Sequence, residues 1–179
     1  MDISIVALII VIISRIFLPL IILKKPLLGG ILAMIADAVD VMIFEAVGGG
    51  YPNYHLFDKS FDMWYLFLEF LVVLKWKDLL AKRTGSVLFI WRFVGFALFE
   101  ITSYKGFFFF APNIFEFFFL ATLVILKFKK SFRYNAKSLT IVLLIVGVPN
   151  IIKEYLMHYK YPNQTWDYLR DKLFWWIYN

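Results

Sequence analysis

Acidic side chains recur at helical spacing within an apolar part of the sequence. Asp58, Asp62 and Glu69 fall within about 40° of one another when each residue advances by about 100°, so they share one face of a helix. An ionisable group inside a membrane span is costly and marks a functional site or an ion pair. Three carboxylates on one stripe therefore predict a face that turns toward a bundle interior or a wet cavity.

Further oxygen ligands occur on two other apolar segments. Asp40 and Glu45 widen the polar face of an earlier segment, and Asn150 and Glu154 follow a proline in a later one. Carboxylate and amide oxygens suit hard cations, and aromatic rings suit organic cations. The sequence predicts one cation or amine site, open to the extracytoplasmic side. Its predicted residues are Asp40, Glu45, Asp62, Glu69, Asn150 and Glu154.

Two histidines allow an alternative, metal-based interpretation. Glu154 and His158 are four residues apart, a spacing at which two side chains on one helix can reach one ion. A metal held by His55, Glu154 and His158 would activate water against a lipid-linked substrate. No Gly-x-Ser-x-Gly, His-Glu-x-x-His or nucleotide-binding motif is present, so the sequence assigns no catalytic residue and leaves the cofactor open.

Matching depths predict two buried ion pairs. Arg15 and Asp37 lie at similar distances from the turn between their segments, and Glu69 and Arg92 flank a basic loop at similar distances. Such pairs persist for structural reasons, because removing one partner leaves an uncompensated charge. We therefore predict an Arg15–Asp37 pair and a Glu69–Arg92 pair.

The composition identifies the environment of these residues. The chain has 179 residues, of which 62% are hydrophobic, 21% aromatic and only 18% charged. Soluble domains are about 45–50% apolar and about 25% charged. The values exclude a soluble domain, a disordered chain and a nucleic-acid-binding protein that owes the net charge of +6 to one basic face. The absence of cysteine excludes disulfides and thiolate metal sites. An integral membrane protein in a lipid bilayer remains.

Apolar runs predict an all-α fold, a polytopic transmembrane helical bundle of six spans plus a short seventh helix. A bilayer core of about 30 Å needs roughly 20 apolar residues per helix. The short seventh segment is Trp166–Tyr178. The six predicted spans are Ile3–Leu23, Pro26–Val47, Phe61–Leu74, Ser86–Ser103, Pro112–Leu126 and Leu139–Met157.

Charge distribution predicts the orientation. Lysines and arginines concentrate after the first, third and fifth predicted spans, which places those loops in the cytoplasm. The N-terminus is then outside, in a bacterial plasma membrane. With this topology, ten of the 13 acidic residues fall in the outer half. Acidic residues contribute little to orientation, so this excess favours a cation-binding role.

An internal repeat is predicted by sliding the chain against itself. A shift of 109 residues places Glu45, Asp58 and Asp62 on Glu154, Asp167 and Asp171. The implied plan is a single transmembrane domain, 1–179, with parallel repeats at 1–80 and 112–179 and a linker helix at 86–103.

This 3+1+3 plan resembles the SWEET and PQ-loop carriers, which are triple-helix bundles joined by a linker helix. Pro112-Asn113 opens the fifth span, although Ile3-Ser4 stands at the corresponding place in the first. The run from Arg15 through Asp37-Ala-Val-Asp40, with Phe57-Asp58-Lys59, is also similar to uncharacterised bacterial polytopic membrane proteins. The first resemblance implies a carrier fold, and neither supplies a substrate.

Two phenylalanine runs are predicted to face lipid or the membrane interface. They are Phe107–Phe110 and Phe117–Phe119. Bulky aromatic residues at such positions are typical of membrane boundaries.

The leading functional prediction is a small transporter or channel-like protein with an acid-lined cation or amine site. A metal-dependent lipid-modifying enzyme and an accessory or scaffold subunit are the alternatives. Six short spans enclose little interior, so a homo-oligomer or a partner membrane subunit is also expected, and no nucleic acid is.

Overall fold

The secondary-structure elements in the described part of the chain are all helices, joined by short loops. The structure is a computed structural model that describes residues 3–46, 54–104 and 106–156, with side chains described except at 3–5, 7, 41–46 and 54–57. The helices are α1 (Ile3–Phe17), the 3-10 helix η1 (Leu18–Leu23), α2 (Pro26–Ala46), α3 (Tyr54–Val73), α4 (Leu79–Thr102), α5 (Gly106–Phe110), α6 (Ile114–Phe128) and α7 (Ala136–Tyr155).

Polar caps and a proline determine where several helices begin and end. The Asp78 and Asn113 side chains accept hydrogen bonds from the first backbone N–H groups of α4 and α6. Asn135 and Ser138 form a reciprocal capping box at the start of α7. Pro19, which has no backbone N–H, lies in the first turn of η1. The first predicted span is therefore helical throughout but changes to 3-10 geometry in its last six residues.

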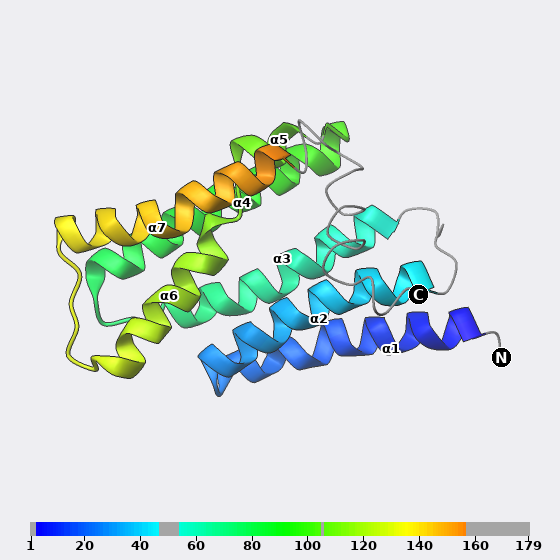
Figure 1. Cartoon of the computed structure of the whole chain (residues 1–179), viewed down its shortest axis with the longest axis horizontal. Helices are drawn as coiled ribbons and strands as arrows, with labels where there is room; N and C mark the ends of the chain where they lie inside the picture. The colour runs from blue at the N-terminus through cyan, green and yellow to red at the C-terminus, as the bar shows by residue number, and fades with distance from the viewer. Residues whose placement is uncertain (1–2, 47–53, 105, 157–179) are drawn as a thin grey trace.

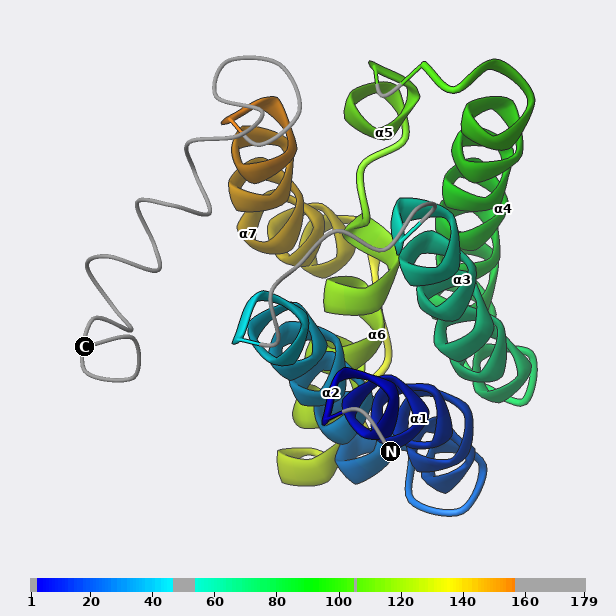
Figure 2. The same ribbon diagram turned by 90° about the vertical axis from the view of Figure 1, so that its right-hand side faces the viewer.

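One helix lies at the centre of the bundle. Figures 1 and 2 show α6 crossing between α2 and α3 on one side and α7 on the other, and α6 contacts α2, α3, α4 and α7. The helices α1 and α2 form an antiparallel pair that packs beside α3 (Figure 1). The element at the middle of the fold is thus a helix rich in phenylalanine.

The phenylalanine runs are divided between core and surface, which corrects the prediction that they face lipid. Phe115, Phe118 and Phe119 of α6 are fully buried, and Phe119 stacks on Trp76 with 6.0 Å between ring centroids. Phe108 of α5 is also buried. Because α6 is surrounded by other helices, its aromatic face packs against protein.

A glycine allows the close approach of α2 to this core. A Cβ atom at Gly30 would lie 2.9 Å from Cδ2 of Leu120 and 3.0 Å from Oε1 of Glu69. Those separations are shorter than ordinary van der Waals contact. Gly30 therefore allows α2 to pack directly on α3 and α6.

Within the described residues, three helical segments are long and apolar enough to cross a membrane. They are Leu79–Thr102, Gly106–Phe128 and Ala136–Tyr155, and Leu8–Leu23 is a shorter apolar helix. Large hydrophobic side chains such as Ile101 and Leu144 are exposed on them, as expected where lipid is the solvent. The chain therefore has the features of an integral membrane protein, while the full set of six spans is not established by these helices.

Some predicted bounds differ from the observed ones. The helix α3 begins at Tyr54 and α4 at Leu79, each seven residues before the predicted span, because the polar first turns were counted as loop. The short helix α5 was not predicted. The last segment, Trp166–Tyr178, is the third helix of the predicted second repeat, and it lies outside the described residues. The repeat therefore stays a prediction.

Candidate cation site

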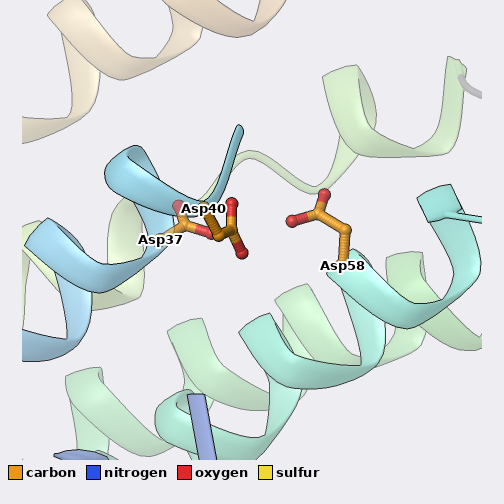
Figure 3. A group of neighbouring side chains, drawn as sticks. All are labelled: Asp37, Asp40 and Asp58. Carbon is orange, nitrogen blue, oxygen red and sulfur yellow. The ribbon is translucent and has the colours of Figure 1, made fainter. Parts of the chain in front are cut away.

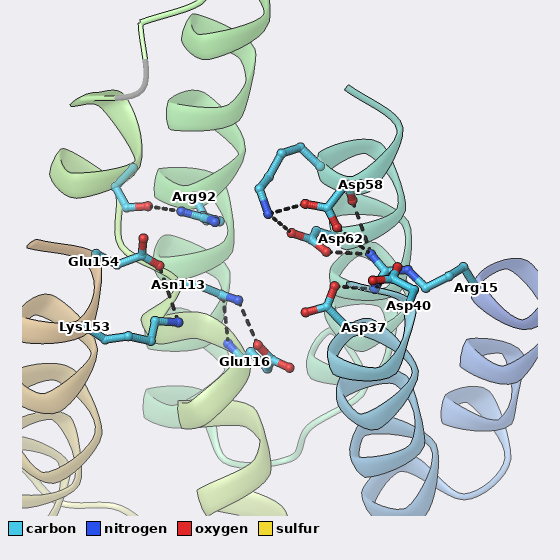
Figure 4. Close-up of polar contacts among 12 residues, drawn as sticks. Arg15, Asp37, Asp40, Asp58, Asp62, Arg92, Asn113, Glu116, Lys153 and Glu154 are labelled. Carbon is cyan, nitrogen blue, oxygen red and sulfur yellow. Dashed lines mark hydrogen bonds and ion pairs between the residues drawn. The ribbon is translucent and has the colours of Figure 1, made fainter. Parts of the chain in front are cut away.

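A buried arginine gathers carboxylates from two other helices. Arg15, in the last turn of α1, is 2% exposed. Its side chain contacts four carboxylates (Figure 4). Arg15, these carboxylates and Lys59, which pairs with two of them, form what we call the acidic cluster. The four carboxylates are Asp37 and Asp40 of α2 and Asp58 and Asp62 of α3.

The two terminal nitrogens of the guanidinium contact different helices. Nη1 pairs with Asp37 and lies 3.2 Å from Oδ2 of Asp40. Nη2 lies 2.8 Å from Oδ1 of Asp62 and 3.6 Å from Oδ1 of Asp58. The planar guanidinium fork can bond several acceptors at once, which a lysine ammonium cannot do in the same geometry. Arg15 therefore connects α1 to both α2 and α3.

A lysine on α3 completes the cluster. The Nζ atom of Lys59 lies 2.7 Å from Oδ2 of Asp58 and 2.9 Å from Oδ2 of Asp62. The helix brings these groups together because residues one turn apart lie on the same face. Nearby, the indole N–H of Trp64 on α3 donates to the carbonyl of Ile16 on α1, and this hydrogen bond also links the two helices.

The ion-pair contacts of the acidic cluster join four carboxylates to two cations. Removing each charge from water costs several kcal/mol, which ion pairing offsets only where the geometry is good. Asp40, Asp58 and Asp62 are all buried. Within the described residues the group therefore has more acidic than basic members, and a further cation would be attracted to it.

Three of these carboxylates have the spacing of a metal-ligand set. One oxygen each from Asp37, Asp40 and Asp58 lie within 4.8 Å of one another. Figure 3 shows Asp37 and Asp40 on α2 facing Asp58 on α3. Hard cations bind oxygen ligands at about 2.0–2.6 Å, so oxygens this close can share one ion. Arg15 contacts the same three residues, and an incoming cation would replace part of its contacts.

A second set of polar side chains lies where α6 meets α7. Asn113 donates from Nδ2 to Oε2 of Glu116 at 2.8 Å, and Lys153 lies 3.6 Å from Glu154 (Figure 4). Asn150 donates to the carbonyl of Val146, while its own Oδ1 has no hydrogen-bond partner. We call these residues the α6–α7 polar group.

The predicted site residues whose side chains are described are thus divided among three places, with Glu69 lying apart from the other two beside Gly30. Asp40 and Asp62 lie together in the acidic cluster, whereas Asn150 and Glu154 lie in the α6–α7 polar group. The central position of α6 separates α7 from α2 and α3. The single site predicted from these helices is therefore divided by α6. The side chains of Glu45 and His55, and all of His158, lie outside the described residues.

Of the two predicted ion pairs, the structure has Arg15–Asp37 but not Glu69–Arg92. Arg15 contacts Asp37, the partner that the depth argument predicts. Arg92 does not pair with Glu69: it donates to the carbonyl of Ala111 at 2.8 Å and lies over the Phe108 ring. The two side chains point in different directions, because Arg92 faces α5 while Glu69 faces α2 and α6 beside Gly30. Glu69 is fully buried, and neither carboxylate oxygen has a hydrogen-bond partner among the described residues.

The predicted site did not include two acidic residues that belong to the acidic cluster. Asp58 was on the predicted stripe but was not included in the predicted site, and Asp37 was assigned only to an ion pair. Asp58 and Lys59 occur one turn before Asp62, and this local pattern of opposite charges was the available signal.

Comparison of the chain with models of known protein families, with curated proteins and with solved structures finds no match in any of the three.

Proposed function

We propose that the protein is a small membrane transporter or channel-like protein that binds a hard cation at the acidic cluster. The observation that carries the proposal is the convergence of Asp37, Asp40 and Asp58, whose oxygens lie within 4.8 Å of one another. Carboxylate oxygens are the ligands that Ca²⁺, Mg²⁺ and similar ions prefer. An ion of that class fits this oxygen set better than an organic amine, which would need an aromatic cage.

The position of the cluster along the predicted spans supports a transport role. In the sequence-derived topology, Arg15 and Asp37 belong to the inner half of the membrane and Asp40, Asp58 and Asp62 to the outer half. The cluster then lies near the midplane of a six-span bundle with its N-terminus outside, in a bacterial plasma membrane. Binding sites of secondary transporters lie near the midplane between bundles of helices.

Arg15 supplies a means of releasing the ion. Its guanidinium already neutralises part of the carboxylate charge, so an entering cation and Arg15 compete for the same oxygens. A site that binds too tightly cannot release its ion during transport. The resident arginine keeps cation binding weak and exchangeable.

The test compares matched charge removals in the two polar sets. Wild type, Asp40→Asn, Asp58→Asn and Glu154→Gln are reconstituted in liposomes, and uptake and equilibrium binding of Ca²⁺, Mg²⁺ and tetramethylammonium are measured. We expect the first two variants to lose hard-cation binding and uptake, while Glu154→Gln, in the α6–α7 polar group, retains both. Unchanged binding in Asp40→Asn and Asp58→Asn, with folding intact, would refute the proposal.

The metal-enzyme alternative predicts a different composition. A stoichiometric transition metal in the purified protein, lost in His55→Ala and His158→Ala, would favour the site formed by those residues and Glu154. Co-purification of a second membrane protein would favour the accessory role.

A further inference from the structure

A cavity of about 510 Å³ lies at one end of the bundle, where α3 and α6 end and α4 and α7 begin. Small-molecule sites are typically clefts of roughly 300–1,000 Å³. We call this cavity the basic pocket. Its charged and aromatic lining consists of Lys75, Lys77, Asp78, Lys130, Arg133, Trp76, Phe132 and Tyr134.

Four cationic side chains line the basic pocket. None of Lys75, Lys77, Lys130 and Arg133 makes an ion pair within 4.0 Å in the part of the chain that the structure describes. All four are exposed at the rim, where a ligand can reach them. The concentration of positive charge around one concave space attracts an anion more strongly than the same charges spread over a surface.

The one acidic residue in the lining is occupied by backbone donors. Asp78 accepts from the N–H groups of Leu80 and Ala81 at 2.9 and 3.0 Å and from that of Tyr134 at 2.6 Å. Partial burial opposes its ionisation, but these hydrogen bonds, with Arg133 nearby, hold the pKa of Asp78 below its usual range. Its carboxylate therefore connects the two loops and offers little opposition to a bound anion.

The walls of the basic pocket are rigid and apolar. The Tyr134 ring packs edge-on to Phe132 at 5.0 Å between centroids and contacts Phe118 at 5.9 Å. The Tyr134 hydroxyl forms a 3.0 Å hydrogen bond with Thr122. Trp76 packs on Phe118 from the opposite loop. Side chains from two loops and from α6 thus support one another around the cavity.

Exposed hydrophobic side chains adjoin the lining residues of the basic pocket in the sequence. Leu74 and Leu79, which are 39% and 59% exposed, flank the lining run from Lys75 to Asp78. Phe128, two residues before Lys130, is 84% exposed. A free inorganic anion would use only the cationic rim. A phospholipid would use both, because its phosphate would meet the bases while its acyl chains followed the exposed hydrophobic side chains.

We propose that the basic pocket binds the phosphate-bearing headgroup of an anionic phospholipid. Lys75, Lys77, Lys130 and Arg133 hold the phosphate, and Trp76 and Phe132 contact the glycerol region. The proposal is independent of the cation site, because it involves other residues at the opposite end of α3.

The experiment measures lipid binding by native mass spectrometry after reconstitution in phosphatidylcholine with increasing phosphatidylglycerol. Wild type is compared with Lys130→Gln/Arg133→Gln and with a control of the same charge change, Lys24→Gln/Lys25→Gln, in the exposed α1–α2 turn. We expect the pocket variant to bind phosphatidylglycerol about tenfold or more weakly, since each direct hydrogen bond from a base to the charged phosphate contributes about a factor of ten. The control should bind like wild type.

Inorganic phosphate, titrated into protein in phosphatidylcholine alone, distinguishes the two sources of the anion. Weak phosphate binding with strong phosphatidylglycerol binding supports the lipid assignment. Phosphate binding as tight as that of the lipid overturns it, and so does an equal loss of lipid in the pocket and control variants, which would show a diffuse surface effect. Unchanged thermal melting of both variants shows that the comparison is between folded proteins.

Discussion

Nη2 of Arg15 lies 2.8 Å from Oδ1 of Asp62, 47 residues further along the chain, and this contact joins the first helix to the third. The same guanidinium pairs with Asp37 on α2. One buried cation is therefore the common neighbour of three helices, and it is also the group with which a bound cation would compete.

Loss of this cation should strongly destabilise the fold. Arg15→Met removes the cation that contacts the buried carboxylates of both α2 and α3, and removal of one partner of a buried pair costs about 3–5 kcal/mol. We expect a large fall in the melting temperature of the detergent-solubilised protein. Arg15→Lys, which keeps the charge but not the fork, should lose less. A melting temperature like that of wild type for Arg15→Met would show that the pairing contributes nothing.

Glu69 should tolerate loss of its charge. Its two carboxylate oxygens are buried with no hydrogen-bond partner in the part of the chain that the structure describes, so an ionised side chain there is unfavourable. Glu69→Gln keeps the shape, and we expect the stability in thermal melting to be unchanged or increased. If Glu69 were held by an ion pair with Arg92, the same variant would lose several kcal/mol.

Gly30 should be sensitive to a single methyl group. A Cβ atom there meets Leu120 at 2.9 Å and Glu69 at 3.0 Å, and overpacking of this kind costs about 1–3 kcal/mol. The matched control is Gly147→Ala on α7, where the nearest atom would be Cδ1 of Ile114 at 3.6 Å. We expect Gly30→Ala to lower the melting temperature and Gly147→Ala to leave it unchanged or raise it, because alanine favours helix. Equal effects would contradict the packing described here.

Stability should fall in acid partly through Asp78. Its pKa is below the usual value in the folded protein, so its contribution is complete above the ordinary aspartate pKa and is lost as the pH falls toward the folded-state value. Protonation weakens acceptance from Ala81 and Tyr134. Thermal melting between neutral and acid pH should therefore show a smaller acid-dependent loss in Asp78→Asn than in wild type. Parallel curves for the two proteins would exclude this role.

The sequence predicted the helical segments because their apolar runs are long and are interrupted by polar turns. It also placed Arg15 and Asp37 at equal depth, and Asp62 on an inward-facing stripe, since these inferences depend only on helix geometry. It did not predict which face of α6 is buried. Phe115 and Phe119 lie on a helix that is apolar on all sides, so no periodic signal distinguishes protein contact from lipid contact.

The prediction of a Glu69–Arg92 pair was wrong for a related reason. Equal depth is necessary for a pair but does not determine direction, and Arg92 turns toward α5 and the Ala111 carbonyl. Asn150 and Glu154 were grouped with Asp62 because the acidic residues fall in the same predicted outer half of the membrane, yet α6 lies between them. Such arrangements depend on packing between segments far apart in the chain.

The four-sided packing of α6 also restricts how the protein can change conformation. A helix that touches α2, α3, α4 and α7 at once cannot rotate against one neighbour without rearranging the other interfaces. Packed interfaces tend to have discrete alternatives and resist continuous deformation. Any movement that alters access to the acidic cluster by displacing α6 will therefore be all-or-none, with few populated intermediates.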